Sequence, residues 1–429
     1  MSSYADFIQR KQRVFLGDGV SSASLPAQLY PFQQALVSWA LKKGRAAIFA
    51  DCGLGKTFMQ VAWANALGKR TLFVAPLCVA EQTVAEALKL GVTVSYAKTQ
   101  DEVNSPLTIT NYERLDAFDA SAFEAVVLDE SSILKAFDGK TRTKLIEMFR
   151  SVRYRLCCTA TPSPNDIAEL ANHAEFLGLM TRAEFLATWF VHDDSGWRMK
   201  KHATQPFYRW LASWAIAMRT PSDLGFSDDG FQLPPLHIHE RIVESDGPSS
   251  SLFPELGLQG IRGRLSARRD SLEARVDAVC NLLPEYGQSW ILWCGLNDEA
   301  DRLESTIPGC VNIQGSDSYA EKRGAIDSFV SGKTKIIASK LRVVGYGMNF
   351  QHCHHMAFVG IGDSFEQYYQ GIRRCWRFGQ KHAVHAHIVV SDAERAVVEN
   401  VKRKEAAYRE MVDAMLDHVR IFEQEEVCA

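Results

Sequence analysis

Short apolar runs alternate along the first half of the chain with longer segments of helical periodicity. The runs cover residues 46–49, 71–76, 92–96, 107–112, 125–128 and 154–158. Runs this short, bounded by glycine, proline or charged residues, are typical of strands buried on both faces of a sheet. The segments between them, such as 58–67 and 79–90, have the apolar spacing of helices. This alternation predicts a doubly wound parallel sheet.

The same alternation resumes in the second half of the chain and predicts a second α/β lobe. Strands are predicted at 289–294, 311–313, 335–339 and 355–359, with helical stretches such as 318–330 between them. Residues 246–263, which are rich in proline, serine and glycine, are interpreted as a linker. The charged, amphipathic stretch 393–426 predicts a final helix that packs back onto a lobe. Its expected buried stripe consists of Val397, Val398, Val401, Met411, Met415 and Leu416.

Residues 177–214 are dense in aromatic side chains and predict a largely helical insertion, broken by the polar turn 192–196. The basic cluster 198–202 next to Trp197 would either touch a phosphate backbone or form a solvated hairpin tip. A second basic group also leaves two interpretations open, a backbone-contacting strip or a solubilising face. It comprises Arg262, Arg264, Arg268 and Arg269.

Chemistry enters with the glycine-rich segment 50–57, which follows the first apolar run and precedes a helical segment. Strand, glycine-rich turn and helix form the context of a phosphate-binding loop. Gly53 and Gly55 would let backbone N–H groups approach phosphate oxygens at the positive end of the new helix. Lys56 would reach the β- and γ-phosphates, and the Thr57 hydroxyl would hold Mg²⁺. The segment therefore predicts a nucleotide site.

An acidic pair follows the apolar run 125–128. Asp129 and Glu130 would lie at the carboxyl end of a strand, where open α/β sheets bind ligands. Asp129 can orient the Mg²⁺ shell, and Glu130 can position and deprotonate an attacking water. Upstream of the loop, Gln33 is our candidate for reading an adenine edge; the alternative is an ordinary solvated helix glutamine. The hydroxyls of residues 159–161, after a later strand, would link this site to a neighbouring surface.

The composition of the chain indicates the kind of protein that would carry such a site. The chain has 429 residues, 46% of them hydrophobic, which favours two or more domains, and its net charge of −3 requires any basic track to be local. The ten cysteines are scattered without a CxxC pair, and no metal ligands are assigned to His352–His355. Neither a signal peptide nor an apolar run of about 20 residues is present, so we expect a soluble, intracellular protein without membrane contact.

In this order, the segments ADCGLGKT, VAP, ITNYERL, LDES and TATP resemble the motifs of superfamily-two helicases, most closely the Swi/Snf-type DNA translocase branch. Ala50 stands where general phosphate loops have glycine, as in helicase-type loops. Ser131 and Ser132 depart from the family's more acidic second motif. The aromatic segment and the loop 221–236 look like those of small helicases carried by phages and prophages.

The segment QGIRRCWRFGQ is similar to the final Swi/Snf-type motif, QxxGRxxRxGQ. Five of its residues match the motif, namely Gln370, Arg374, Arg377, Gly379 and Gln380. Arg373 stands where the family has glycine. Arg374 and Arg377, three apart and expected on one helical face, would act as arginine fingers on the γ-phosphate.

The resemblance implies an α/β fold of two RecA-like lobes with parallel sheets, plus the helical insertion and the C-terminal helix. The implied boundaries are a flexible lead-in at 1–24, lobe 1 at 25–240 with the insertion at about 177–220, a linker at 241–271, lobe 2 at 272–393 and the final helix at 394–429.

The implied activity is an ATP- and Mg²⁺-dependent DNA helicase or translocase, acting mainly on duplex DNA without sequence preference. ATP would lie between the lobes, which would close over it and reopen after hydrolysis. The protein would act as a monomer in the cytoplasm, encoded by a phage in a bacterial host. Two alternatives stay open: an RNA helicase of the same architecture, and an ATP-gated remodeller or clamp of nucleoprotein complexes.

Overall fold

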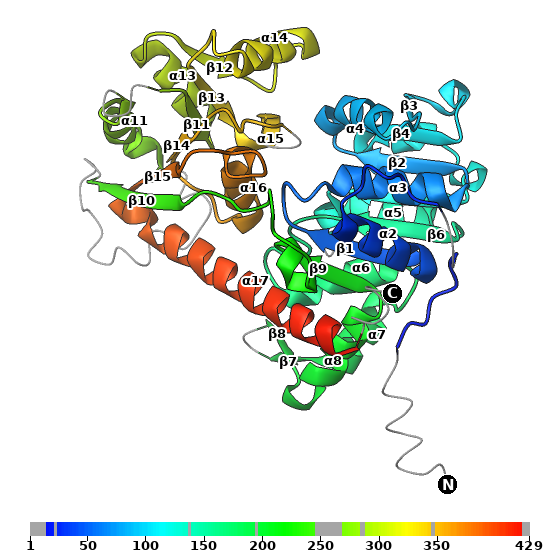
Figure 1. The fold of residues 1–429 in the computed structure, drawn as a ribbon. Coiled ribbons are helices and arrows are strands. Elements are labelled where there is room, and N and C mark those ends of the chain that lie inside the picture. The colour runs from blue at the N-terminus through cyan, green and yellow to red at the C-terminus, as the bar shows by residue number, and fades with distance from the viewer. Residues whose placement is uncertain are drawn as a thin grey trace. The chain divides into compact units, whose positions relative to one another are not determined.

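The structure is a computed structural model that describes residues 14–20, 24–135, 139–193, 196–244, 268–283, 288–344 and 348–422 (Figure 1). The chain forms two compact units, Met1–Phe231 with Ala406–Ala429, and Gln232–Glu405. Each unit contains one large parallel sheet with helices packed on it, which confirms the predicted α/β class of two RecA-like lobes. Among the described residues, no helix is long and apolar enough to cross a membrane.

The sheet of the first unit has the strand order β3-β4-β2-β5-β6-β1-β9, and its pairs are parallel. The strands are β1 (Arg45–Ala50), β2 (Thr71–Ala75), β3 (Ser95–Tyr96), β4 (Leu107–Asn111), β5 (Ala125–Asp129), β6 (Tyr154–Cys158) and β9 (Ala215–Met218). Because β6 lies between β5 and β1, the chain leaving β6 emerges between the ends of the other two strands. That placement matters for the site.

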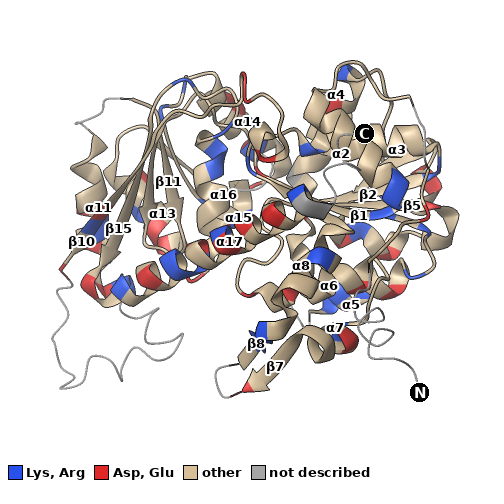
Figure 2. Cartoon of the chain, turned by 60° about the horizontal axis from the view of Figure 1, so that its bottom comes forward, with Lys and Arg blue, Asp and Glu red and all other residues tan. Residues whose placement is uncertain are grey.

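Helices cover both faces of this sheet, with α2, α3 and α4 on one side and α5 and α6 on the other (Figures 1 and 2). The helices are α2 (Pro31–Lys43), α3 (Lys56–Leu67), α4 (Leu77–Lys89), α5 (Lys140–Met148), α6 (Leu170–Phe176), α7 (Arg182–Trp189) and α8 (Thr204–Ala212). Short 3₁₀ turns include η2 (Tyr112–Ala117) and η4 (Ser131–Lys135). With both faces covered, strands such as β2, β4, β5 and β6 are buried throughout, which explains their uninterrupted apolar sequences.

Part of the expected flexible lead-in is anchored to the first unit. The backbone N–H groups of Gly19 and Val20 donate to the carbonyl oxygens of Lys42 and Leu41 at 3.1 and 2.8 Å. These carbonyls belong to the last turn of α2, which has no intrahelical donors left for them. Residues 14–20 therefore satisfy the end of a helix instead of forming a free leader.

The aromatic-rich insertion is only partly helical. After α7 the chain forms an antiparallel hairpin of β7 (Phe190–Asp193) and β8 (Gly196–Met199), and after α8 it contributes β9 to the main sheet. The basic cluster begins on β8, where Arg198 pairs with Asp193 at 3.2 Å. Most of the aromatic side chains pack on one another in a buried group. Its members are Phe185, Trp189, Phe190, Phe207, Trp210 and Trp214.

The sheet of the second unit has the order β10-β15-β14-β11-β13-β12, again with parallel pairs. Its strands are β10 (Leu236–Val243), β11 (Trp290–Cys294), β12 (Cys310–Ile313), β13 (Ile336–Lys340), β14 (His355–Val359) and β15 (Val384–Ser391). Its helices are α11 (Leu272–Cys280), α13 (Asn297–Thr306), α14 (Tyr319–Val330), α15 (Leu341–Val344) and α16 (Phe365–Cys375). The predicted helix at 318–330 corresponds to α14, which Ser318 caps by accepting from the N–H of Glu321.

One expected boundary and one expected surface residue differ from the structure. Strand β10 pairs with β15 along its whole length, so the second unit begins at Gln232 and not after residue 240. Arg268, expected in a solvated or DNA-facing strip, is buried and bonded to Glu299. Arg262 and Arg264, like most of the expected linker, lie outside the described residues.

The last helix, α17 (Arg395–Phe422), carries the predicted amphipathic pattern. All six residues of its expected stripe are buried. Figure 2 shows basic and acidic residues interspersed along this helix. Its residues from Ala406 onward belong to the first unit, so the expected packing back onto a lobe is present there.

Candidate functional site

The glycine-rich segment forms a tight turn between β1 and α3. Gly53 and Gly55 have φ of 94° and 77°, in the left-handed region that glycine tolerates best. A Cβ on Gly55 would lie 2.4 Å from Nε2 of Gln33, so another residue there would strain the backbone and displace the Gln33 side chain. Helix α3 begins directly at Lys56, with no side-chain cap on its first turn. Its first N–H groups therefore remain available to phosphate oxygens.

Lys56 and Gln33 both lie against this turn. The Lys56 ammonium donates to the carbonyl oxygens of Ala50 and Asp51 at 3.0 and 3.4 Å, which places it inside the loop. Gln33, at the N-terminus of α2, is 3% exposed and donates from Nε2 to the Leu54 carbonyl at 2.9 Å. The interpretation of Gln33 as a solvated glutamine is therefore wrong. Its reading of adenine stays a prediction.

The acidic pair lies at the carboxyl end of β5. Asp129 pairs in register with Cys158 of β6, which in turn pairs with Ile48 of β1, so the acidic pair lies at the edge of the sheet from which the loop leaves. Glu130 has φ of 50° and is the one described non-glycine residue with a positive φ. Such a backbone costs on the order of 1–3 kcal/mol and persists when surrounding contacts hold it. This strain accompanies the residue predicted to activate water.

Two residues that the sequence did not point to hold Asp129 in place. Gln60 donates from Nε2 to Asp129 Oδ1 at 2.7 Å, and the Tyr112 hydroxyl donates to the Asp129 carbonyl at 2.7 Å. Burial, and then the neighbouring Glu130, raise the pKa of Asp129 to about 6, while Gln60 and Lys56 act to lower it. Burial, followed by the charge of Asp129, raises the pKa of Tyr112 well above its ordinary value, so this hydroxyl stays a donor.

A sequence signal for both contacts exists. Gln60 lies one helical turn after Lys56 and therefore shares a face with it. Tyr112 directly follows β4, whose carboxyl end lies at the same edge of the sheet as that of β5.

The turn after β6 contacts Glu130. The Thr159 hydroxyl lies 3.3 Å from Glu130 Oε2 and accepts from the N–H of Thr161 at 3.1 Å. Because that N–H occupies the acceptor side of the hydroxyl, its hydrogen is directed to the carboxylate. The strand order explains the contact, since β6 is the neighbour of β5.

The two serines that depart from the family motif are buried. Ser131 Oγ forms a 3.1 Å hydrogen bond with Nε2 of His173 on α6. Burial lowers the pKa of His173 to about 3, so the ring is neutral. The Asn172 side chain donates to the Leu134 carbonyl at 2.7 Å. Helix α6 thus fixes the turn that follows the acidic pair.

In the second unit, both predicted arginine fingers bond one carbonyl. The guanidinium groups of Arg374 and Arg377 donate from Nη1 to the Met348 carbonyl at 3.2 and 3.3 Å. The expected single helical face is wrong, because α16 ends at Cys375 and Arg377 lies beyond it. Arg374 also bonds the side chain of Gln370, another matching motif residue.

Arg373, at the motif's glycine position, lies over its neighbours' rings. Its guanidinium carbon is 4.4 Å from the Trp376 ring centroid and 5.4 Å from that of Tyr369. These cation–π contacts account for an arginine at this position without a role at the nucleotide. The two arginine fingers and the phosphate loop belong to different units, so their action on one nucleotide stays a prediction.

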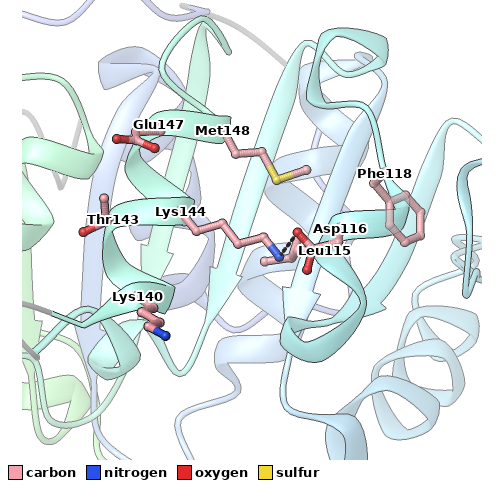
Figure 3. A pocket seen from close by; sticks show the side chains of 8 residues that line it. All are labelled: Leu115, Asp116, Phe118, Lys140, Thr143, Lys144, Glu147 and Met148. Atoms are coloured by element: carbon pink, nitrogen blue, oxygen red, sulfur yellow. Dashed lines mark ion pairs between the residues drawn. The ribbon is translucent and has the colours of Figure 1, made fainter.

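A separate pocket opens on the first unit, away from the phosphate loop (Figure 3). It has a volume of about 590 Å³ and lies between η2 and α5. Within it Lys144 pairs with Asp116 at 2.6 Å. None of the predicted site residues lines this pocket, so its volume does not bear on the nucleotide site.

The residues around the phosphate loop fit an Mg²⁺-nucleotide. Open helix-start amides and an ammonium provide for phosphates, while the buried Asp129 provides carboxylate oxygens, of which Oδ1 accepts from Gln60. A hard cation prefers such oxygen ligands. Among the described residues, no cluster of three or more metal-binding side chains forms an independent metal site.

Comparisons with known proteins agree with the second unit's sequence motif. Residues 274–379 match the helicase conserved C-terminal domain, which confirms the helicase resemblance for this part of the chain. No curated protein matches the chain. Among solved structures, the chain is similar to a Sulfolobus solfataricus SWI2/SNF2 ATPase core in complex with dsDNA. That similarity has 16% identity and a TM-score of 0.44, and covers 96% of this chain and 99% of that one.

Proposed function

We propose that this protein is an ATP-hydrolysing translocase of the Swi/Snf branch of superfamily-two helicases, which moves mainly along duplex DNA. The observation that carries the proposal is one sheet edge in the first unit. There a phosphate-type loop with Lys56 lies near the buried Asp129 and the strained Glu130. The helicase conserved C-terminal domain in the second unit supports the same class.

In this proposal, the phosphate loop and the residues next to it hold the nucleotide and its cation. The backbone of Gly53 and Gly55 and the ammonium of Lys56 hold the phosphates of ATP. Thr57 and Asp129 hold Mg²⁺, which when bound neutralises charge on the β- and γ-phosphate oxygens. Gln33, whose side chain donates to the Leu54 carbonyl of the loop, reads the adenine edge in this proposal.

Glu130 orients the attacking water and accepts its proton. The hydrogen bond from Thr159 and the left-handed backbone of Glu130 hold this carboxylate in one orientation. Arg374 and Arg377 stabilise charge that develops on the γ-phosphate, and must release the Met348 carbonyl or share its hydrogen bonds to do so.

Contacts with nucleic acid would be made to the phosphate backbone. Such contacts carry no sequence information, as a moving enzyme requires. The preference for DNA over RNA rests on the resemblance of residues 370–380 to the Swi/Snf-type final motif. We propose that the protein acts as a monomer.

The test is ATP turnover with duplex DNA, single-stranded DNA or RNA added, with Lys56→Ala as the inactive control. We expect duplex DNA to stimulate turnover most. Stimulation by RNA alone would point to an RNA helicase, and turnover without any stimulation to an ATP-gated clamp. Wild-type protein with no more turnover than Lys56→Ala under all conditions would refute the proposal.

A further inference from the structure

The turn after β6 is fixed by a segment that follows it 248 residues later. The hydroxyl of Tyr408, on α17, donates to the carbonyl of Ala160 at 2.6 Å. Three residues further along both segments, Ser163 Oγ lies 2.9 Å from the sulfur of Met411, about one helical turn along α17. Thr159, Ala160 and Thr161 are all fully buried, and Tyr408 is 7% exposed. Burial and these two contacts with α17 therefore hold the turn in place.

The same turn carries the hydrogen bond to Glu130. Thr159 accepts from Thr161 and is thereby oriented to donate to the Glu130 carboxylate. Ala160 lies between these two threonines. A shift of its carbonyl moves the peptide units on both sides, and with them the Thr159 hydroxyl. Tyr408 is thus connected to Glu130 by two hydrogen bonds that the backbone of residues 159 and 160 joins.

The position of α17 on the first unit does not depend on Tyr408 alone. Arg420 donates to the Asp223 carbonyl at 3.0 Å, and Asp413 pairs with Arg219 at 2.6 Å. The His418 ring stacks on Tyr208 at 5.5 Å, and a buried apolar stripe supports the helix. Removing the Tyr408 hydroxyl should therefore leave the helix docked and free only the turn.

We propose that Tyr408 is a positioning residue for ATP hydrolysis, which holds the 159–161 turn so that Thr159 orients Glu130. The inference rests on the proposed function, because it assigns to Glu130 the activation of water. It adds a contribution from the C-terminal helix to the chemistry in the first unit. Tyr408 itself touches no substrate.

The first experiment is Tyr408→Phe in the full chain, which keeps the ring and removes only the hydroxyl. We expect ATP turnover to fall about three- to tenfold, as the loss of one buried hydrogen bond implies, with ATP affinity unchanged within about twofold. The matched control is Tyr208→Phe. It removes a hydroxyl from another buried tyrosine beside α17 that does not contact the turn, and it should leave turnover unchanged.

A double-variant cycle separates positioning from general loosening. Thr159→Val removes the hydroxyl at the Glu130 end of the path. If Tyr408 acts through Thr159, the double variant should be no slower than Thr159→Val alone. Independent structural damage would multiply the two losses. Ser163→Ala, expected to lower turnover about twofold, probes the same turn if Tyr408→Phe folds poorly.

Normal turnover in Tyr408→Phe, an equal loss in Tyr208→Phe, or multiplicative losses in the cycle would each overturn the inference. In all three cases the wild-type protein still hydrolyses ATP, so the proposed function stands. A wild-type protein without hydrolysis overturns both the proposed function and the role of Tyr408.

Discussion

The two units differ in the partners that they give to a buried carboxylate. In the second unit, Glu299 is fully buried and bonds Arg268 at 2.6 Å and Arg275 at 2.7 Å. It also accepts from the N–H groups of Gly295 and Leu296. In the first unit, buried Asp129 has no ion pair within the described part of the chain. Its side chain is hydrogen-bonded by the neutral amide of Gln60.

The pKa values follow this difference. Burial alone would raise the pKa of Glu299, but Arg268 and Arg275 hold it below its ordinary value. Burial, and then the neighbouring Glu130, raise the pKa of Asp129 to about 6, and Gln60 and Lys56 offset only part of this rise. A buried charge with all its partners present stabilises a fold only if the partners stay in place. One without a partner marks a site prepared for a cation from outside.

The largest effect should come from separating the roles of the two units in hydrolysis. Lys56→Ala, in the first unit, should abolish ATP binding and turnover together, because the loop loses its phosphate-binding ammonium. Arg374→Ala, in the second unit, should keep ATP affinity within a few fold and lower turnover by about 10³ or more, as loss of an arginine finger does. Equilibrium binding of a fluorescent ATP analogue and steady-state turnover measure the two effects.

Arg373→Ala is the control for Arg374→Ala, since Arg373 stacks on aromatic rings of its own segment. It should leave turnover within about threefold of wild type. Normal hydrolysis by Arg374→Ala would remove that residue from the site.

Neutralising a buried carboxylate should lower the free energy of unfolding much more in the second unit than in the first. Glu299→Gln leaves Arg268 and Arg275 without their shared anion and should lower the free energy of unfolding by about 3–5 kcal/mol. Asp129→Asn removes a charge that lacks a cation and should change stability by no more than about 1 kcal/mol, while abolishing turnover. Chemical denaturation with both variants measures this. Equal destabilisation would show that Asp129 is also a structural charge.

The sequence predicted most of the uniformly buried strands, but it left out β9 and β15, which are also buried almost throughout, and the more exposed β10. β1, β2, β5 and β6 are apolar runs because helices cover both of their faces. β10 was not predicted, because this edge strand keeps His237, Glu240 and Arg241 at the surface. Its position in the sheet comes from pairing with β15, which no local pattern records.

In the site, the residues of local motifs were predicted from the sequence, whereas the residues that support them were not. Lys56 and the glycines act within one turn, so spacing alone identified them. Gln60, Tyr112 and Tyr408 reach Asp129 or the 159–161 turn from other elements, and these contacts exist only once the sheet order is set. Arg377 shows the reverse error: its spacing suited a helix that ends two residues earlier.

Acidification should lower the folding stability of the second unit and remove a cost to that of the first. In register across β10, β15 and β14, histidines stack at ring distances of 4.6–5.3 Å. Burial, and then neighbouring histidines, lower the pKa of His355 to about 3 and, with Arg241 as well, that of His387 to about 4. Their neutral forms contribute stability that is complete above pH 6.5 and is lost as pH falls toward 4.

The effect of pH on the stability contribution of Asp129 has the opposite sign to that of the histidines. Its raised pKa means that ionisation opposes folding, a cost that is present above pH 6 and disappears as pH falls below it. Hydrogen exchange, corrected for intrinsic rates, should show β14 and β15 losing protection between pH 7 and 5 while β5 does not. Each proton taken up by the unfolded state changes stability by about 1.4 kcal/mol per pH unit. The reverse ordering of the two sheets would contradict this account.

Gln60→Met tests whether the amide sets the charge state of Asp129. The side chains are of similar volume, but methionine donates no hydrogen bond, so the pKa of Asp129 should rise further. Turnover at pH 7 should fall about three- to tenfold and recover at pH 9, since the carboxylate is ionised there. Gln34→Met, on the outer part of α2, is the control. A pH–rate profile parallel to that of wild type would exclude an effect through ionisation.

The smallest effect should come from an ion pair with good geometry but no burial. Arg302 donates twice to Glu273 at 2.8 and 2.9 Å, distances comparable to those within the buried network around Glu299. The two side chains are 46% and 61% exposed, so water screens the pair. Arg302→Ala should therefore leave the midpoint of denaturant unfolding almost unchanged. A loss approaching that of Glu299→Gln would mean that pairing itself, and not burial, sets the cost of removing charge from this unit.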